Sequence, residues 1–175
     1  RGIMGRKRNT TNSIAGTYEI STGELVVEPD PFRDGAFILN VNGVPSSHII
    51  PDEPRTLEFE YMRWIAAAVE NLAPGKRLLH LGGGGCSLPR YFADLWPDSH
   101  NTVVELDAKL AELIRELADI PSAPRVKIRA GEARAVTEGF PPNRFDVIIR
   151  DVFAGAVTPE PLTTQDFFQH AHATL

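Results

Sequence analysis

The residues best placed to do chemistry form a glycine cluster between an apolar run and a predicted helix. The apolar run spans residues 78–81, and the helix is expected from about residue 88. Glycine tolerates positive φ and lets the backbone approach a ligand closely, and the start of a helix has free N–H groups. This layout predicts a cradle for a nucleotide-like ligand, although a tight turn that binds nothing would use the same residues. The cluster consists of Gly82, Gly83, Gly84 and Gly85.

An acid follows the glycines at the distance that such a site needs. Glu105 ends a second apolar run about 20 residues later, and its carboxylate can accept two hydrogen bonds from a ribose diol. Asp107 is better suited to cap the next helix. The glycines do not follow the G-x-G-x-x-G pattern, and no Lys-Ser/Thr pair comes after them. The sequence therefore argues against a P-loop and, less strongly, against a nicotinamide site.

Two further carboxylates follow predicted strands. Glu132 comes just after the third strand, where it could accept a hydrogen bond from an adenine amino group; a solvent-facing turn acid is the alternative. Asp151 ends an apolar strand, where a partly buried carboxylate could orient or deprotonate a substrate amine; the alternative is a cap for the following loop. We expect Cys86 and His80 to pack inside the fold, and no residue spacing indicates a metal site.

Apolar periodicity predicts an α/β fold preceded by a small antiparallel β module. Residues 17–50 are rich in β-forming residues, and Asn42-Gly43 indicates a hairpin. Further along, strands alternate with helices, which predicts a Rossmann-like parallel sheet with its ligand at the carboxyl ends of the strands. The expected strands are 78–81, 103–106, 125–130 and 144–151, and the expected helices are 88–95, 108–117 and 164–175.

A helix over residues 56–72 is expected to connect the two parts. Thr56 is its predicted N-cap, and Tyr61 and Trp64 lie on the apolar stripe that should face the core. The Pro-rich stretch before this helix marks a boundary. The predicted divisions are a flexible tail over 1–16, the β module over 17–54 and the Rossmann-like domain over 55–175.

Composition and charge limit the class of protein. The chain has 175 residues, which suits one domain with a small appendage, and its net charge of −5 argues against a broad nucleic-acid footprint. Its one cysteine cannot form an internal disulfide, which fits a reducing compartment. No apolar run approaches the roughly 18 residues of a membrane span, and no apolar signal core is present. We therefore expect a cytoplasmic protein that binds neither a membrane nor nucleic acid.

Four segments together resemble those of one family. They are residues 79–85, 103–107, 130–133 and 146–151. They are similar to those of the polyamine aminopropyltransferases (spermidine synthases), which have the S-adenosylmethionine-dependent methyltransferase fold. The resemblance looks closest to a divergent actinobacterial type. It extends from about residue 17 to the end, because the antiparallel module with its Asn-Gly hairpin also fits the family.

The resemblance implies a role for each matching residue. Glu105 would bind the ribose hydroxyls of decarboxylated S-adenosylmethionine or methylthioadenosine, Glu132 would lie near the adenine, and Asp151 would position the attacking amine. Because a sulfonium is already an activated leaving group, such an enzyme mainly orients the amine and keeps it unprotonated. The resemblance thus implies aminopropyl transfer to a small amine without a metal, and a homodimer is one expected assembly.

The sequence also departs from the family's motifs. Gly85 and Ala154 stand where the family has aspartates, and Ser46 stands where it has a glutamine. Carboxylates are the electrostatic partners of cationic amines, so nucleoside binding is better supported than spermidine synthesis. One alternative is a methyltransferase that uses S-adenosylmethionine itself, whose carboxylate would occupy the space left at Gly85. Another is a non-catalytic nucleoside-binding relative. The family's fold continues with three more strands, so we expect a truncated C-terminus.

Overall fold

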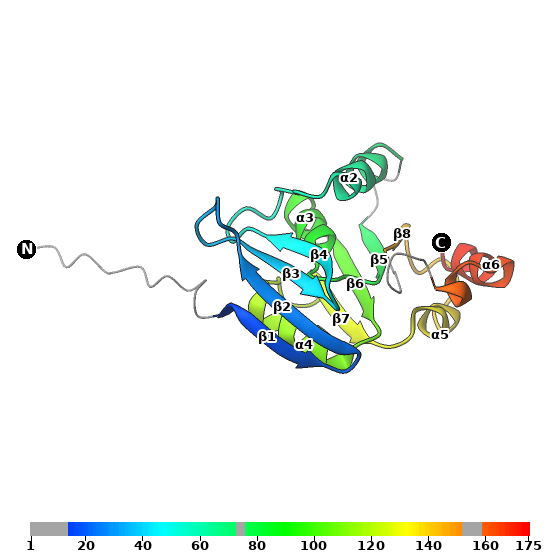
Figure 1. Cartoon of the computed structure of the whole chain (residues 1–175). Helices are drawn as coiled ribbons and strands as arrows, with labels where there is room; N and C mark the ends of the chain where they lie inside the picture. The colour runs from blue at the N-terminus through cyan, green and yellow to red at the C-terminus, as the bar shows by residue number, and fades with distance from the viewer. Residues whose placement is uncertain (1–13, 73–75, 152–158) are drawn as a thin grey trace, which may run out of the picture.

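The computed structural model describes residues 14–72, 76–151 and 159–175 and contains two four-stranded sheets. Figure 1 shows the antiparallel sheet at one end of the molecule and the helices of the C-terminal part at the other, with the parallel sheet between them. The predicted α/β fold with a small antiparallel β module is confirmed. Most of the predicted tail and Ala154 lie outside the described residues.

The antiparallel sheet is a meander of four consecutive strands. Its hairpin at Asn42-Gly43 is confirmed, since both residues have positive φ, 51° and 77°. Pro45 lies in an edge strand, as its missing N–H requires. The strands are β1 (Gly16–Ile20), β2 (Gly23–Pro29), β3 (Phe37–Val41) and β4 (Val44–Ile49), in the order β1-β2-β3-β4.

The second sheet is entirely parallel, with the order β7-β6-β5-β8. Parallel strands need crossover connections, and here helices supply them. After β7 the chain enters a short helix at Ala133, directly after Glu132. The strands are β5 (Arg77–Leu81), β6 (His100–Glu105), β7 (Val126–Ala130) and β8 (Val147–Arg150). The helices are α2 (Glu60–Leu72), α3 (Ser87–Leu95), α4 (Ala108–Leu117), α5 (Ala133–Glu138), the 3₁₀ turn η1 (Glu160–Leu162) and α6 (Gln165–Thr174).

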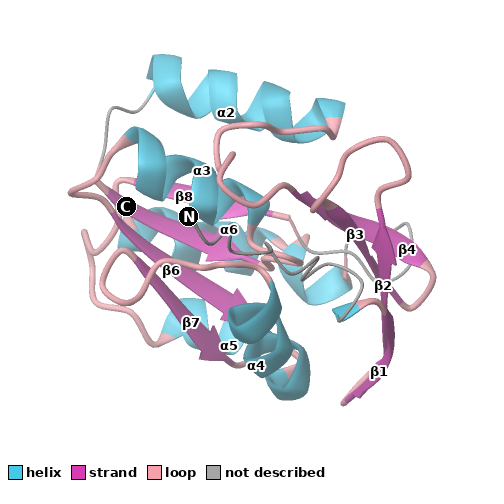
Figure 2. Cartoon of the chain, turned by 90° about the vertical axis from the view of Figure 1, so that its left-hand side faces the viewer, coloured by secondary structure: helices cyan, strands magenta, loops and turns pink. Residues whose placement is uncertain are grey.

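Alternate residues of β5 face opposite sides of the parallel sheet. Leu78 packs in a buried cluster with Met62 of α2 and Phe92 of α3. Leu79 packs in another cluster with Phe167 of α6. Figure 2 shows α3 between α2 and the strands. Strand β5 is therefore covered by apolar side chains on both faces of the sheet.

The two sheets share part of their apolar core. Leu25 and Leu39 of the antiparallel sheet lie in the same buried cluster as Val103 of β6 and Ile114 of α4. The antiparallel sheet is thus packed against the parallel-sheet part rather than linked to it by chain alone. The predicted division of the chain at residue 54 stays a prediction.

Helix α2 differs from its prediction in start and face. It begins at Glu60 rather than near Thr56, whose N–H and hydroxyl both bond to Glu53 instead. Its buried residues include Met62, whereas Trp64 is 66% exposed. Tyr61 is also exposed. The predicted N-cap and the inward positions of Tyr61 and Trp64 are therefore wrong. None of the helices in the described ranges has the length and apolar character needed to cross a membrane.

Candidate functional site

The glycine loop lies at the carboxyl end of β5 and has the backbone that its sequence predicts. Gly82 has φ 79° and Gly84 has φ 50°, values that favour glycine. Cys86 follows with φ 60° and forms the N-cap of α3 without a side-chain cap bond. The loop therefore turns the chain sharply from the strand into the helix.

Hydrogen bonds within the protein already occupy most N–H groups of this loop. The N–H of Gly82 donates to the Val104 carbonyl over 2.9 Å, and that of Cys86 donates to the Gly83 carbonyl over 2.7 Å. The N–H of Gly85 donates to Ser47 Oγ over 2.8 Å. A phosphate cradle needs several free backbone N–H groups that converge on the anion. The loop therefore suits a ligand that approaches closely without a phosphate group.

Glu105 lies beside the glycine loop, as the spacing predicts. Its half-buried carboxylate accepts from the Asp107 N–H over 3.1 Å and faces the N–H of Gly83. Burial raises the pKa of Glu105, and these backbone donors only partly offset that effect. The structure therefore brings the predicted acid to the predicted loop, with remaining acceptor capacity on the carboxylate.

Asp107 is the N-cap of α4, as predicted. Its carboxylate accepts from the N–H of Leu110 over 2.9 Å. It also accepts from the N–H of Ser21 over 3.1 Å and from the N–H and hydroxyl of Thr22, each over 2.7 Å. One side chain thus caps a helix and fastens the β1–β2 turn to the end of β6.

Asp151 directly follows β8, and its N–H donates to the Leu81 carbonyl over 2.9 Å. The side chain is therefore held next to the glycine loop, on the opposite side from Glu105 in the order β6-β5-β8. Burial raises the pKa of Asp151. Tyr61 donates its hydroxyl to Asp151 over 3.3 Å. Burial and this negative neighbour raise the pKa of Tyr61 well above its usual value, so the phenol remains a donor.

Tyr61 and Ser47 contact the candidate site, although nothing in their local sequence indicates it. The helical spacing of Tyr61 predicts a core residue, as it usually does for an aromatic side chain. Ser47 lies in an unremarkable polar pair of β4. Both act through contacts across long sequence separations, 90 residues for Tyr61–Asp151 and 38 for Ser47–Gly85. Local spacing carries no signal for such pairs.

Glu132 is the N-cap of α5. Its two carboxylate oxygens accept from the N–H groups of Arg134 and Ala135, over 2.9 Å and 2.8 Å. The side chain is exposed at the carboxyl end of β7. The capping bonds account for its position, and its role near an adenine stays a prediction.

His80 and Cys86 are buried, as predicted. His80 Nε2 lies 2.9 Å from Asn101 Oδ1, and burial lowers the pKa of the imidazole to about 4. Burial and the nearby Glu105 raise the pKa of the Cys86 thiol to about 12. A protonated thiol is a poor nucleophile, which argues against covalent chemistry at Cys86. The buried, neutral imidazole of His80 is not exposed to a ligand, which argues against acid–base chemistry there.

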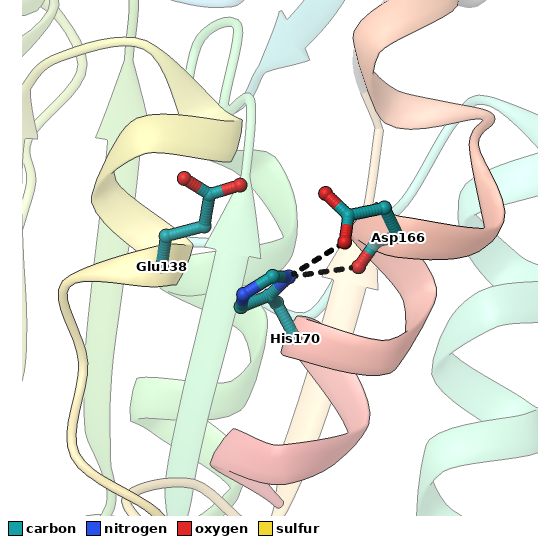
Figure 3. Close-up of side chains that lie close together, drawn as sticks. All are labelled: Glu138, Asp166 and His170. Carbon is teal, nitrogen blue, oxygen red and sulfur yellow. Dashed lines mark hydrogen bonds and ion pairs between the residues drawn. The ribbon is translucent and has the colours of Figure 1, made fainter.

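A surface cluster away from the loop contains Glu138, Asp166 and His170 (Figure 3). Their potential ligand atoms lie within 4.8 Å of one another. Arg134 already occupies this cluster, with its Nε 2.9 Å from Glu138 Oε1 and its other end bonded to Asp166. The guanidinium balances the two carboxylates, so the cluster is accounted for as an ion-pair network between α5 and α6.

The comparisons with known proteins first define the class of fold. No protein-family model matches the chain. Human methyltransferase-like protein 13 has 25% identity and a TM-score of 0.59, over 67% of this chain and 60% of that one. The chain therefore has the methyltransferase fold, in agreement with the parallel sheet and its glycine loop.

The comparisons then identify the relatives within that fold. A probable spermidine synthase from Corynebacterium glutamicum has 55% identity and a TM-score of 0.88, over 93% of this chain and 60% of that one. The polyamine aminopropyltransferase of Vibrio vulnificus is 27% identical over 125 residues, which are 70% of this chain and 42% of that protein. The predicted resemblance to the polyamine aminopropyltransferase (spermidine synthase) family is confirmed. The chain spans only part of the length of these relatives.

Proposed function

We propose that this chain forms the nucleoside-binding part of a polyamine aminopropyltransferase. The observation that carries the proposal is the placement of Glu105 and Asp151 on the strands that flank the glycine strand β5. A ligand whose ribose is held at Glu105 and whose reacting carbon faces Asp151 must cross the glycine loop. The loop's occupied N–H groups favour a nucleoside joined to sulfur over a phosphate-bearing nucleotide.

The proposed co-substrate is decarboxylated S-adenosylmethionine, and the proposed acceptor is a small amine. The nitrogen lone pair of the amine attacks the carbon next to the sulfonium, and the electrons of the breaking C–S bond pass to sulfur. The products are an alkylated ammonium, which loses a proton, and neutral methylthioadenosine. Asp151 is the proposed group that orients the amine and receives its proton. Tyr61 holds that carboxylate in place.

The burial of Asp151 suits this role. A carboxylate with a raised pKa is a stronger base than an exposed aspartate. A cationic amine that approaches it gains a charge-assisted hydrogen bond in a partly desolvated place. Glu105 is the other carboxylate at the loop, and it is proposed to hold the ribose.

The packing around Gly85 argues against one reason for the methyltransferase alternative. The sequence suggested that the absent side chain at Gly85 leaves room for the carboxylate of S-adenosylmethionine. A Cβ at residue 85 would instead lie 2.6 Å from Leu39 Cδ1 and 2.6 Å from Ser47 Cβ. The space is already filled, so that expectation is wrong. The structure of human methyltransferase-like protein 13 was solved in complex with SAH. SAH is itself an adenosyl-sulfur compound, so this neighbour agrees with the proposed class of ligand.

Calorimetry with three ligands tests the proposal. Decarboxylated S-adenosylmethionine and methylthioadenosine should bind more tightly than S-adenosylmethionine. A preference for S-adenosylmethionine would favour the methyltransferase alternative. If none of the three binds, the nucleoside site is misassigned.

The amine acceptor, the homodimer and the cytoplasmic location remain predictions.

A further inference from the structure

We propose that Ser47 is a positioning residue of the nucleoside site, through which the antiparallel sheet fixes the glycine loop. The inference rests on the proposed function, because it assigns Ser47 an effect on nucleoside affinity. Ser47 lies on β4, which belongs to the antiparallel sheet and not to the sheet that carries the loop. It would act by holding Gly85, without touching the ligand.

The hydroxyl of Ser47 makes two hydrogen bonds in the interior. Its oxygen accepts from the N–H of Gly85 over 2.8 Å and donates its proton to the Ser46 carbonyl over 2.7 Å. Ser47 is fully buried, at 0% exposure, and Gly85 is buried beside it. Because both groups are buried, the Gly85 N–H depends on this hydroxyl, and losing it would leave a buried donor unpaired.

Side-chain packing reinforces the hydrogen bond. A Cβ added at Gly85 would meet Leu39 and Ser47 at 2.6 Å, and one added at Gly84 would lie 3.2 Å from the Ser46 carbonyl. These are distances at which the added atom would force something to move. The loop backbone therefore lies directly against β3 and β4, and the antiparallel sheet forms one wall of the loop.

The loop conformation and the placement of Glu105 depend on each other. The Gly83 N–H faces the Glu105 carboxylate, and the Gly83 carbonyl accepts from Cys86. A shift of Gly85 would move this short turn and with it the donor that faces Glu105. Precise placement of polar groups sets the affinity of a small-molecule site. Ser47 is thus coupled to ribose binding through Gly85, Gly83 and Glu105.

The test compares Ser47→Ala with Ser99→Ala as a matched control. Ser99 is also 0% exposed and hydrogen bonded, donating to the Phe92 carbonyl and accepting from Asn101, but it precedes β6 at the end remote from the loop. Binding of methylthioadenosine is measured by calorimetry, and thermal unfolding is followed for each variant. Ser47→Ala should weaken binding about tenfold, as expected for one lost hydrogen bond, while Ser99→Ala should lower the melting temperature without changing affinity.

Amide hydrogen exchange of Gly85 gives an independent reading. In the wild-type protein this N–H should exchange slowly, and in Ser47→Ala it should exchange at least tenfold faster at equal global stability. Ser47→Cys, with a weaker acceptor of similar size, should fall between the two in both measurements and serves if the alanine variant does not fold. Unchanged affinity in Ser47→Ala, or an equal loss in Ser99→Ala, would overturn the proposal. If the wild type binds no methylthioadenosine, the proposed function fails, whereas slow Gly85 exchange would still establish the Ser47 contact.

Discussion

At the end of β6, two carboxylates lie two residues apart in opposite surroundings. Asp107, at the junction with the antiparallel sheet, is desolvated, but donors from Leu110, Thr22 and Ser21 outweigh that and lower its pKa to about 2. Glu105, on the side of the glycine loop, has fewer donors, and burial raises its pKa. The carboxylate of Asp107 therefore stabilises the fold, whereas the carboxylate of Glu105 keeps acceptor capacity that a ligand could use.

The two ends of β8 repeat this contrast. Asp146, before the strand, is hydrogen bonded to Arg77 and to the N–H of Lys76, and its pKa is lowered. Asp151, after the strand, receives one bond from Tyr61, and its pKa is raised. An acid that the fold has fully satisfied stabilises the fold, whereas a partly buried and under-satisfied acid costs stability and is a candidate for a functional site. Substitutions at these acids and at Tyr61 test this distinction.

The largest effect is expected at Asp151. Asp151→Asn should reduce aminopropyl transfer about 100-fold or more, because the amide cannot accept a proton from the amine. Its stability at pH 7 should be unchanged or higher: the folded-state pKa is raised, so above that pKa the ionised carboxylate opposes folding. Transfer assays and thermal unfolding measure both. Asp146→Asn, which breaks the contacts with Arg77, is the control and should show the reverse pattern, with lower stability.

Asp107→Asn should destabilise the fold by about 2 kcal/mol at pH 7, because the amide nitrogen cannot accept the bonds from the β1–β2 turn. The stabilising effect of the wild-type carboxylate is fully present above the unfolded-state pKa of about 4. It is lost as the pH falls toward the folded-state value of about 2. Urea unfolding at several pH values should therefore show the variant and wild type converging between pH 4 and 2. Asp34→Asn, at an exposed loop acid, is the control, and an equal effect there would remove the distinction.

Glu105→Ala should weaken binding of methylthioadenosine by about 1–3 kcal/mol, the usual cost of losing a charged acceptor. Glu132→Ala removes another acid at the carboxyl edge, and because its oxygens cap α5 it should mainly lower stability, by about 1 kcal/mol. Calorimetry on both variants compares them directly. A larger affinity loss at Glu132 than at Glu105 would assign the former to the ligand and restore its predicted place near the adenine.

The smallest effect is expected at Tyr61. Tyr61→Phe removes one hydrogen bond to Asp151, which should slow transfer by a few-fold, corresponding to about 1 kcal/mol. That bond lowers the pKa of Asp151. Without it the carboxylate ionises at higher pH, so the acid side of the pH–rate profile should move upward. A profile that stays in place would mean that Tyr61 does not act on Asp151.

Local rules predicted the elements whose signals are self-contained. Helix α4 begins and ends as expected because Asp107 supplies a side-chain cap and the apolar residues follow one face. The Asn42-Gly43 hairpin formed because both residues tolerate positive φ. The glycine loop and Glu105 came together because neighbouring parallel strands end at one edge.

Features that depend on packing across the chain could not be predicted in this way. The stripe predicted for α2 is only partly right. Val69 is buried and Ile65 packs against the core as expected, whereas Trp64 is exposed. Aromatic and small apolar residues occur on both sides of this helix, and only the packing against the sheet decides which of them are buried. The contacts Tyr61–Asp151 and Ser47–Gly85 join segments that no periodicity relates. The site is thus only partly encoded in its own motifs.

The close packing of Gly85 against Leu39 and Ser47 has a consequence for how this sequence can change over time. A side chain at residue 85 requires space that two strands of another sheet occupy, so a single substitution there is obstructed from the start. Smaller residues at 39 or 47 would have to appear first, and they would initially leave a void. Positions 39, 47 and 85 should therefore vary together among related sequences, and we expect a carboxylate at 85 to be gained only together with smaller residues at 39 or 47.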